Sequence, residues 1–302
     1  MMQYTTIGKT GLRVSRLCLG CMSFGAAGTM HAWTLDEKAT ATMVHHALDL
    51  GINFFDTANV YSAGTSETYL GAALRTVPRD KVVIASKVYF NPGRLSAAAI
   101  HREIDGSLKR LGTDYLDLYI IHRFDYDTPI EETMRALDDL VKAGKVRALG
   151  ASAMYAYQFH NIQLVAEKEG LTPFSAMENH YNLLYREDER ELIPVCRQYG
   201  VSLMPYSPLA AGHLARPTGQ SDSLRGRTDR VAMGKIGWKR QIRRSSPRSK
   251  TSRSGTESRW RRRRLPGIGE DRCLSDSRCN ERSVSRRSRE GAGGETLGRG
   301  YC

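Results

Sequence analysis

The sequence lacks any long hydrophobic run. No stretch of about eighteen apolar residues occurs in it, which is the length that a membrane-spanning helix needs. The first residues, MMQYTTIGKTGLR, also lack the apolar core of a secretory signal peptide. These absences argue against the membrane and secreted classes, and we expect a cytoplasmic protein.

Cysteine is scarce, with 6 residues in 302. Cys18 and Cys21 form a CxxC pair, but neither a second pair nor a histidine cluster follows at the spacing of a zinc site, so we expect no metal. Cys18 lies in an apolar run and is interpreted as a core residue rather than a redox thiol. Disulfide bonds are not expected in the cytosol.

Two glycine-rich signatures are missing. No GxGxxG follows an early apolar run, and GCMSFG (20–25) contains neither that motif nor the GK[ST] of a phosphate loop. A doubly wound dinucleotide-binding sheet would normally carry the first motif, so its absence argues against that fold.

Charge is distributed unevenly along the chain, whose net charge is +13. Residues 236–302 hold 19 Lys and Arg against 7 Asp and Glu, whereas residues 1–235 hold 26 against 25. The basic character that would suggest nucleic acid therefore belongs to the C-terminal segment alone.

Short apolar runs alternate with amphipathic stretches over the first 200 or so residues, after a β-hairpin expected at residues 8–11. Such alternation is typical of βαβ units with a parallel sheet. We predict an α/β fold, a (β/α)8 TIM barrel in which strand eight and the last helices are not recognisable. The predicted strands are 17–20, 52–56, 82–86, 116–121, 146–151, 174–178 and 201–206, and the predicted helices are 36–50, 66–75, 96–110, 130–143, 156–169 and 187–199.

Polar residues stand where consecutive strands of this barrel end. Asp56 ends the second strand with Tyr61 in the loop after it, Lys87 ends the third, and His122 follows the fourth. Taken singly, each has an ordinary alternative as a cap, a surface aromatic, a solvated strand end or a core histidine. Active sites of barrels lie at the C-terminal ends of strands, so the four are expected to converge.

This set suits protonation of an oxygen on which negative charge develops. A phenol has a pKa near 10, and a neighbouring ammonium held by a carboxylate is expected to lower it. A histidine can orient a carbonyl oxygen by a hydrogen bond. The four residues therefore indicate carbonyl reduction with Tyr61, Asp56, Lys87 and His122 as catalytic residues.

Around these residues the sequence resembles the aldo-keto reductase family of NADPH-dependent (β/α)8 enzymes. The branch with the potassium-channel β subunits and bacterial reductases of broad substrate range is the most similar. The resemblance covers residues 1–235. Its segments are GLRVSRLCLG, INFFDTANVYSAGTSE, VVIASK, DYLDLYIIHRFD, VKAGKVRALGAS, NHYNLLYREDER and GVSLMPYSPLAAGHL.

The resemblance implies Tyr61 as the proton donor, Asp56 and Lys87 as the pair that lowers its pKa, and His122 as the residue that orients the carbonyl substrate. It implies NADP(H) as cofactor, with Tyr206 stacked on the nicotinamide, Ser152 on the carboxamide, and the loop after strand seven along the pyrophosphate. The implied cofactor-binding residues are Gly20, Met22, Asp56, Ser152, Glu178, Tyr206, Ser207, Leu209 and Gly212.

Two positions depart from the family pattern. Ala153 follows Ser152 where Asn is usual, and Glu178 stands where Gln is usual. A carboxylate cannot donate a hydrogen bond as an amide does, so we expect weaker cofactor binding.

The resemblance ends after residue 235, and we divide the chain into a barrel, 1–235, and an Arg/Ser-rich segment, 236–302. That segment has almost no aliphatic runs and is expected to be disordered. The sudden change suggests translation in another reading frame; a genuine basic tail is the alternative. The loop that grips the adenosine 2′-phosphate in the family is not recognisable.

Two other functions stay open at this point. The same fold serves as a regulatory subunit in the channel β proteins, and the basic segment could bind nucleic acid, although it lacks interleaved aromatics. Neither the physiological substrate nor the oligomeric state can be read from the sequence.

Overall fold

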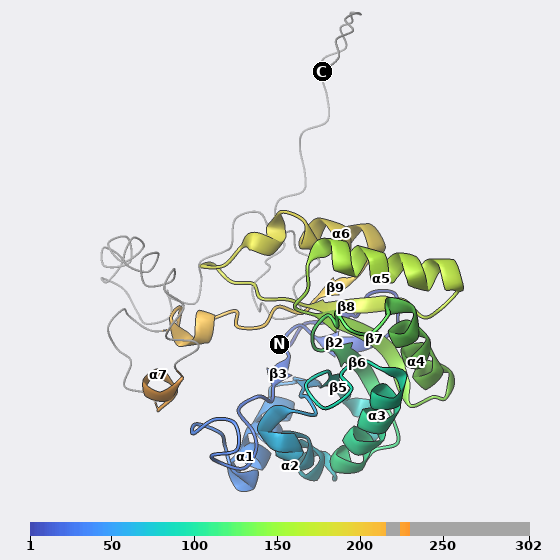
Figure 1. The fold of residues 1–302 in the computed structure, drawn as a ribbon. Coiled ribbons are helices and arrows are strands. Elements are labelled where there is room, and N and C mark those ends of the chain that lie inside the picture. Colours follow the sequence, from blue (N-terminus) through green and yellow to red (C-terminus); the bar gives the residue numbers. More distant parts are fainter. Residues whose placement is uncertain (216–223, 230–302) are drawn as a thin grey trace, which may run out of the picture.

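A computed structural model of the chain describes residues 1–215 and 224–229. Seven strands form one parallel sheet whose spatial order follows the sequence from β3 to β9. The sheet is curled, and helices cover its outer side (Figure 1). This arrangement confirms an incomplete (β/α)8 barrel. The strands are β3 (Leu19–Gly20), β4 (Phe54–Asp56), β5 (Val83–Val88), β6 (Leu116–Ile121), β7 (Val146–Ser152), β8 (Phe174–Glu178) and β9 (Ser202–Leu203).

The helices begin and end at residues that suit those positions. The Asp36 side chain accepts a hydrogen bond from Ala39 N at 2.8 Å at one start, and Gly112 ends another helix with φ 67°. The helices are α1 (Glu37–Asp49), α2 (Thr65–Leu74), α3 (Ala97–Leu111), α4 (Ile130–Lys142), α5 (Ala156–Glu169), α6 (Leu192–Tyr199) and α7 (Leu224–Thr228), with the 3-10 turns η1 (Tyr61–Gly64), η2 (Arg79–Lys81), η3 (Glu187–Glu189) and η4 (Ala210–Gly212).

Two predicted elements are shorter than expected. The helix predicted at 187–199 is divided into η3 and α6, because Pro194 is tolerated only in the first turn of a helix. The strand predicted at 201–206 is regular only over β9, but backbone bonds continue beyond it. Met204 N–H donates to the carbonyl oxygen of Met177 and Tyr206 N–H to that of Asn179, each at 2.8 Å, and Tyr206 forms an isolated bridge with His180.

Two apolar layers surround the sheet because side chains alternate along each strand. Phe55 faces outward into a large cluster between the sheet and its helices. Phe54 faces inward into a second cluster, which fills the barrel interior together with Leu118, Ile120 and Met204. The inward positions at the C-terminal ends of the strands are therefore where polar residues would meet.

The expected N-terminal hairpin is present, with β1 (Tyr4–Thr6) antiparallel to β2 (Arg13–Ser15). Its buried residues Ile7 and Val14 join the interior cluster. The Gly8 N–H donates to Ser202 Oγ at 2.7 Å, and Gly8 adopts φ 47°. A Cβ there would lie 2.8 Å from the carbonyl oxygen of Ser175, so only glycine fits. The hairpin thus closes the barrel interior at the end opposite the C-terminal ends of the strands.

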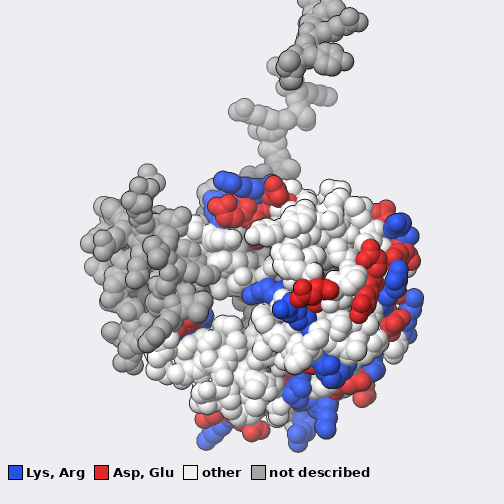
Figure 2. Space-filling view, viewed as in Figure 1, with Lys and Arg blue, Asp and Glu red and all other residues white. Residues whose placement is uncertain are grey.

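Charges of both signs alternate on the surface of the described part, as Figure 2 shows along the margin formed by α3 and α4. Within the described residues, no helix is long and apolar enough to cross a membrane. The Arg/Ser-rich segment 236–302, for which we expect disorder or a changed reading frame, lies outside the described residues.

Candidate active site

Asp56 and Lys87 meet at the C-terminal ends of two neighbouring strands. β4 and β5 pair in parallel with Asp56 opposite Ala85, which places Lys87 two residues further along on the same inward face. The Lys87 ammonium donates to both Asp56 oxygens at 2.7 Å. It also donates to the carbonyl oxygen of Thr57 at 2.8 Å and lies 3.3 Å from the Tyr61 hydroxyl. Three of the four predicted residues therefore form one buried cluster.

The turn that carries Tyr61 is strained. Ser62 and Ala63 adopt φ 48° and 54°, in the left-handed region that non-glycine residues avoid. Ser62 Oγ donates to the carbonyl oxygen of Phe24 at 3.1 Å, and Thr65 Oγ1 donates to the carbonyl oxygen of Ser62 at 2.7 Å. These bonds hold the turn in a conformation that places the phenol beside Lys87.

A partly buried ion pair on the outer side of the sheet supports the same turn. Arg110 Nε lies 2.6 Å from Glu67 Oε2, and Glu67 Oε1 accepts a hydrogen bond from Ser86 at 2.5 Å. Gly64, at φ 88°, lies directly against this arginine, since a Cβ there would be 2.8 Å from Arg110 Cδ. α2 and α3 thereby fix the C-terminal end of the Tyr61 turn, at Gly64.

His122 lies immediately after β6, and its ring meets the Tyr61 ring edge-on at a centroid distance of 5.7 Å. Its Nδ1 atom is buried and has no hydrogen-bond partner among the described residues. Burial, followed by the charges of Lys87 and Arg123, lowers the pKa of His122 to about 2. The imidazole is therefore neutral and can orient an oxygen without competing as an acid.

The expected lowering of the Tyr61 pKa is wrong as a net effect. Burial raises the pKa of the phenol above its usual value, and the charge of Lys87 opposes that rise without cancelling it. For Lys87 itself burial lowers the pKa, but Asp56, then Glu178 and Tyr61, raise it by more. The cluster consequently holds a protonated phenol beside a permanently charged ammonium.

Three residues expected to contact a cofactor lie around this cluster. Ser152 and Glu178 stand opposite each other at the ends of β7 and β8. Glu178 Oε2 lies 3.4 Å from Lys87 Nζ. The Tyr206 ring stacks on His180 at a centroid distance of 5.0 Å and an interplanar angle of 14°. The structure brings these side chains to the same rim as the four catalytic candidates.

The loop after β9 contains an unusual run of backbone conformations. Ser207, Ala210 and Ala211 have φ values of 55°, 48° and 55°, and Gly212 has 98°. The loop's own carbonyl groups hold this conformation: Ala210 N–H donates to the carbonyl oxygen of Ser207 at 2.8 Å, and Gly212 N–H donates to that of Leu209 at 3.0 Å.

The remaining two cofactor candidates, Gly20 and Met22, lie at the end of β3 and in the turn after it, next to Asp56. Gly20 pairs with Asp56 in the β3–β4 register, and the following residue, Cys21, donates its N–H to the carbonyl oxygen of Asp56 at 2.7 Å. Met22 follows and is half-buried. Both are close to the cluster along the chain.

Comparison with known proteins agrees with this geometry. The model of the aldo/keto reductase family matches residues 16–253. The chain belongs to the aldo/keto reductase family. The match runs past residue 235, where the resemblance was expected to end, but leaves most of the C-terminal segment unmatched.

Relatives from fungi give the same result. The chain is 45% identical over 258 residues to an aldo-keto reductase of Fusarium vanettenii, covering 75% of this chain and 70% of the relative. It is 44% identical over 253 residues to an aldo-keto reductase of Metarhizium robertsii, covering 74% and 68%. It is 42% identical over 253 residues to the versiconal hemiacetal acetate reductase of Aspergillus parasiticus, covering 76% and 73%. The chain is thus an oxidoreductase of the carbonyl-reducing kind.

Aldo/keto reductases generally use NAD(P)H, and the residues present fit such a group. Buried polar atoms without partners among the described residues lie at the rim, on His122, Glu178 and Asn179. The departure at residue 153 has a structural consequence, since Ala153 adopts φ 46°, a conformation that Asn accepts more readily.

The sequence analysis did not identify two side chains that lie at this rim, Phe90 and Arg123. Phe90 meets the His122 ring edge-on at 5.0 Å, and the Arg123 guanidinium lies 5.7 Å from the Phe90 ring centroid. Arg123 also donates to the carbonyl oxygen of His122 at 2.7 Å. Phe90 follows the end of β5, and Arg123 follows the end of β6. The search for polar residues at strand ends that identified Lys87 and His122 could have found both if it had included aromatic residues and the first residues of the following loops.

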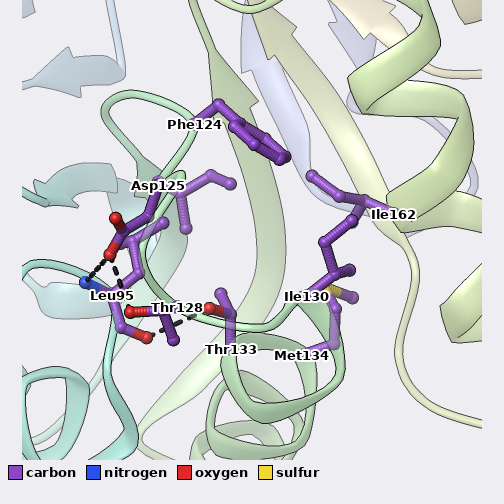
Figure 3. Close-up of a pocket in the computed structure, with 9 residues that line it drawn as sticks. Leu95, Phe124, Asp125, Thr128, Ile130, Thr133, Met134 and Ile162 are labelled. Carbon is purple, nitrogen blue, oxygen red and sulfur yellow. Dashed lines mark hydrogen bonds between the residues drawn. The ribbon is translucent and has the colours of Figure 1, made fainter.

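A hollow lined by none of the four catalytic candidates lies between the sheet and helices α4 and α5 (Figure 3). Its lining is mostly apolar. Its one carboxylate, Asp125, accepts hydrogen bonds from Leu95 N at 3.2 Å and from Thr128 Oγ1 at 2.8 Å. A satisfied carboxylate in an apolar lining does not suit carbonyl chemistry. Among the described residues, no group of three or more His, Cys, Asp or Glu could hold a metal ion.

Proposed function

We propose that the chain is an NADPH-dependent reductase of aldehydes and ketones in which Tyr61 donates the proton. The observation that carries this proposal is the buried contact of the Lys87 ammonium with Asp56 at 2.7 Å and with the Tyr61 hydroxyl at 3.3 Å. The cofactor, when bound, supplies the hydride that adds to the carbonyl carbon.

The protein groups then complete the reduction. As negative charge develops on the carbonyl oxygen, the Tyr61 O–H donates its proton to that oxygen. The phenolate left behind is stabilised by Lys87, whose charge Asp56 holds in place. Neutral His122 orients the carbonyl oxygen by a hydrogen bond from its ring N–H. Each role needs a group within reach of one oxygen atom, which the observed convergence provides.

The dinucleotide would lie along the rim from β7 to the loop after β9. Tyr206 would stack on the nicotinamide, Ser152 and Glu178 would face its carboxamide, and the loop carrying Ser207, Leu209 and Gly212 would follow the pyrophosphate. Gly20 and Met22 would border the same space. The preference for NADPH over NADH rests on the resemblance alone, because the 2′-phosphate loop was not recognisable in the sequence.

We place this reaction in the cytosol. Among the described residues, Cys18, Cys21 and Cys196 form no disulfide, and burial raises the pKa of Cys196 to about 12. An unreactive thiol of this kind is a core residue.

The substrate is a small carbonyl compound.

The test is turnover by the purified full-length chain. NADPH oxidation, followed by its absorbance, is measured with a panel of aromatic aldehydes and one bulky aromatic ketone, and repeated with NADH. We expect carbonyl-dependent oxidation of NADPH that exceeds oxidation of NADH. A chain that binds NADPH but turns over no member of the panel would contradict the proposed activity.

A further inference from the structure

Two carboxylates face a single ammonium in this site. Asp56 lies 2.7 Å and Glu178 lies 3.4 Å from Lys87 Nζ. Lys87 is fully buried, and both carboxylates are buried beside it. If both acids were ionised, the cluster would carry a net negative charge away from water.

The hydrogen bonds of the ammonium go to groups other than Glu178. Lys87 Nζ donates to the two Asp56 oxygens at 2.7 Å, to the Thr57 carbonyl oxygen at 2.8 Å and to the Tyr61 hydroxyl at 3.3 Å. Glu178 Oε2 is buried and has no hydrogen-bond partner among the described residues. An ionised Glu178 would therefore be a buried charge without a donor, which is strongly unfavourable.

The other groups around Glu178 do not remove this penalty. Cys18, Tyr61 and Tyr206 face it from β3, from the loop after β4 and from the segment after β9, and each is uncharged at neutral pH. Arg123, after β6, also acts on it, and its effect is smaller than those of Asp56 and Lys87. Burial, followed by the charge of Asp56, raises the pKa of Glu178 to about 7.

We propose that Glu178 is a positioning residue that supports the reaction in its protonated form. While Glu178 holds a proton, Lys87 stays with Asp56 and stabilises the charge that develops on Tyr61. When Glu178 loses that proton to solvent, it competes with Asp56 for the ammonium and adds negative charge beside Tyr61, which makes the phenol a weaker acid. This inference rests on the role proposed for Tyr61.

The proposal requires that kcat/KM for carbonyl reduction falls with rising pH, and that deprotonation of Glu178 causes this fall. Above its pKa, kcat/KM of the native chain should fall by up to about tenfold for each pH unit, because only the protonated fraction is competent. In Glu178→Gln the neighbour of Lys87 is neutral at every pH. The ratio of kcat/KM at about pH 9 to that at about pH 6 should then be at least tenfold higher in Glu178→Gln than in the native chain.

A matched control is Asp188→Asn. Burial also raises the pKa of Asp188, but this carboxylate accepts a hydrogen bond from Asn179 at 2.9 Å and makes no contact with Lys87. Asp188→Asn should keep the ratio of the native chain. If kcat/KM of Glu178→Gln fell with rising pH as steeply as that of the native chain, and with the same midpoint, the proposal would be overturned.

A second measurement needs neither cofactor nor substrate. Infrared difference spectra of the purified chain between about pH 6 and pH 9 should show loss of a protonated-carboxyl C=O band near neutrality, and this band should be missing in Glu178→Gln. A band that persists in the variant would contradict the assignment. If no carbonyl compound is reduced at any pH, the proposed function fails, while the infrared titration still decides the protonation of Glu178.

Discussion

The Lys87 ammonium donates to both carboxylate oxygens of Asp56 at 2.7 Å, from the neighbouring strand and with no exposed surface of its own. This pair fixes the charge on which the chemistry depends. The Tyr61 hydroxyl lies at 3.3 Å from the same nitrogen, so the proton donor and the charge that supports it belong to one unit.

Tyr61→Phe removes the proton donor and keeps the ring. We expect aldehyde reduction to fall by about two orders of magnitude or more, because general acid catalysis contributes on that scale. NADPH binding, followed by quenching of tryptophan fluorescence, should change little, since the phenol oxygen touches Lys87 rather than the expected cofactor residues. Near-native turnover by the phenylalanine variant would show that another group donates the proton.

The two members of the ion pair should differ in their effect on stability. Lys87→Met leaves Asp56 and Glu178 buried without a cation, and we expect it to lower the free energy of unfolding by about 3–5 kcal/mol. Asp56→Asn leaves Lys87 with Glu178 as a counter-ion 3.4 Å away, so its loss should be smaller. Urea unfolding of both variants and of the native chain measures the difference. If Asp56→Asn lost more unfolding free energy than Lys87→Met, Glu178 would not replace Asp56 as the counter-ion of Lys87.

His122 should make the fold sensitive to mild acid. Its folded pKa is about 2, whereas an unfolded histidine titrates near 6.5, so below about pH 6.5 only the unfolded chain binds a proton there. The stability that His122 contributes is present above that value and is lost as the pH falls. Between pH 7 and pH 5 the loss from this residue should be about 2 kcal/mol.

His122→Gln isolates this contribution, because glutamine does not titrate. Urea unfolding at both pH values, for the native chain and the variant, gives the difference directly. The native chain should lose more stability on acidification than the variant does. Equal losses in the two proteins would mean that His122 is charged, or freely solvated, in the fold.

Ala153 occupies the left-handed region at φ 46°, next to the expected cofactor residue Ser152. We expect Ala153→Asn to raise the free energy of unfolding by up to about 1 kcal/mol, because asparagine tolerates this conformation better than alanine does. Ala153→Val, as the opposite control at the same position, should lower it. Thermal unfolding of the three chains measures the order, and a stabilising valine would contradict the backbone explanation.

The order of strands and helices was readable from the sequence alone. Apolar runs alternate with amphipathic stretches at a spacing that only a parallel α/β sheet accommodates, and hydrophobic periodicity is a local signal. Asp56, Lys87 and His122 were found because each is the polar residue at the end of an apolar strand. The start of α6 was not located from the sequence, because proline is accepted only in the first turn of a helix and the hydrophobic pattern around Pro194 does not show where that turn begins.

The electrostatic character of the site was decided only by the tertiary structure. From the sequence, Lys87 was expected to lower the Tyr61 pKa, yet burial outweighs it, because desolvation depends on everything packed around the phenol. In the sequence, Glu178 was only a departure from the family pattern. That it lies 3.4 Å from Lys87 and yet accepts no hydrogen bond among the described residues appears only when β5 and β8 are brought together in the curled sheet. The sequence therefore determined which groups are present and on which strand ends they stand. Their protonation and mutual pairing were settled by distances and burial between residues far apart in the chain, which no local pattern encodes.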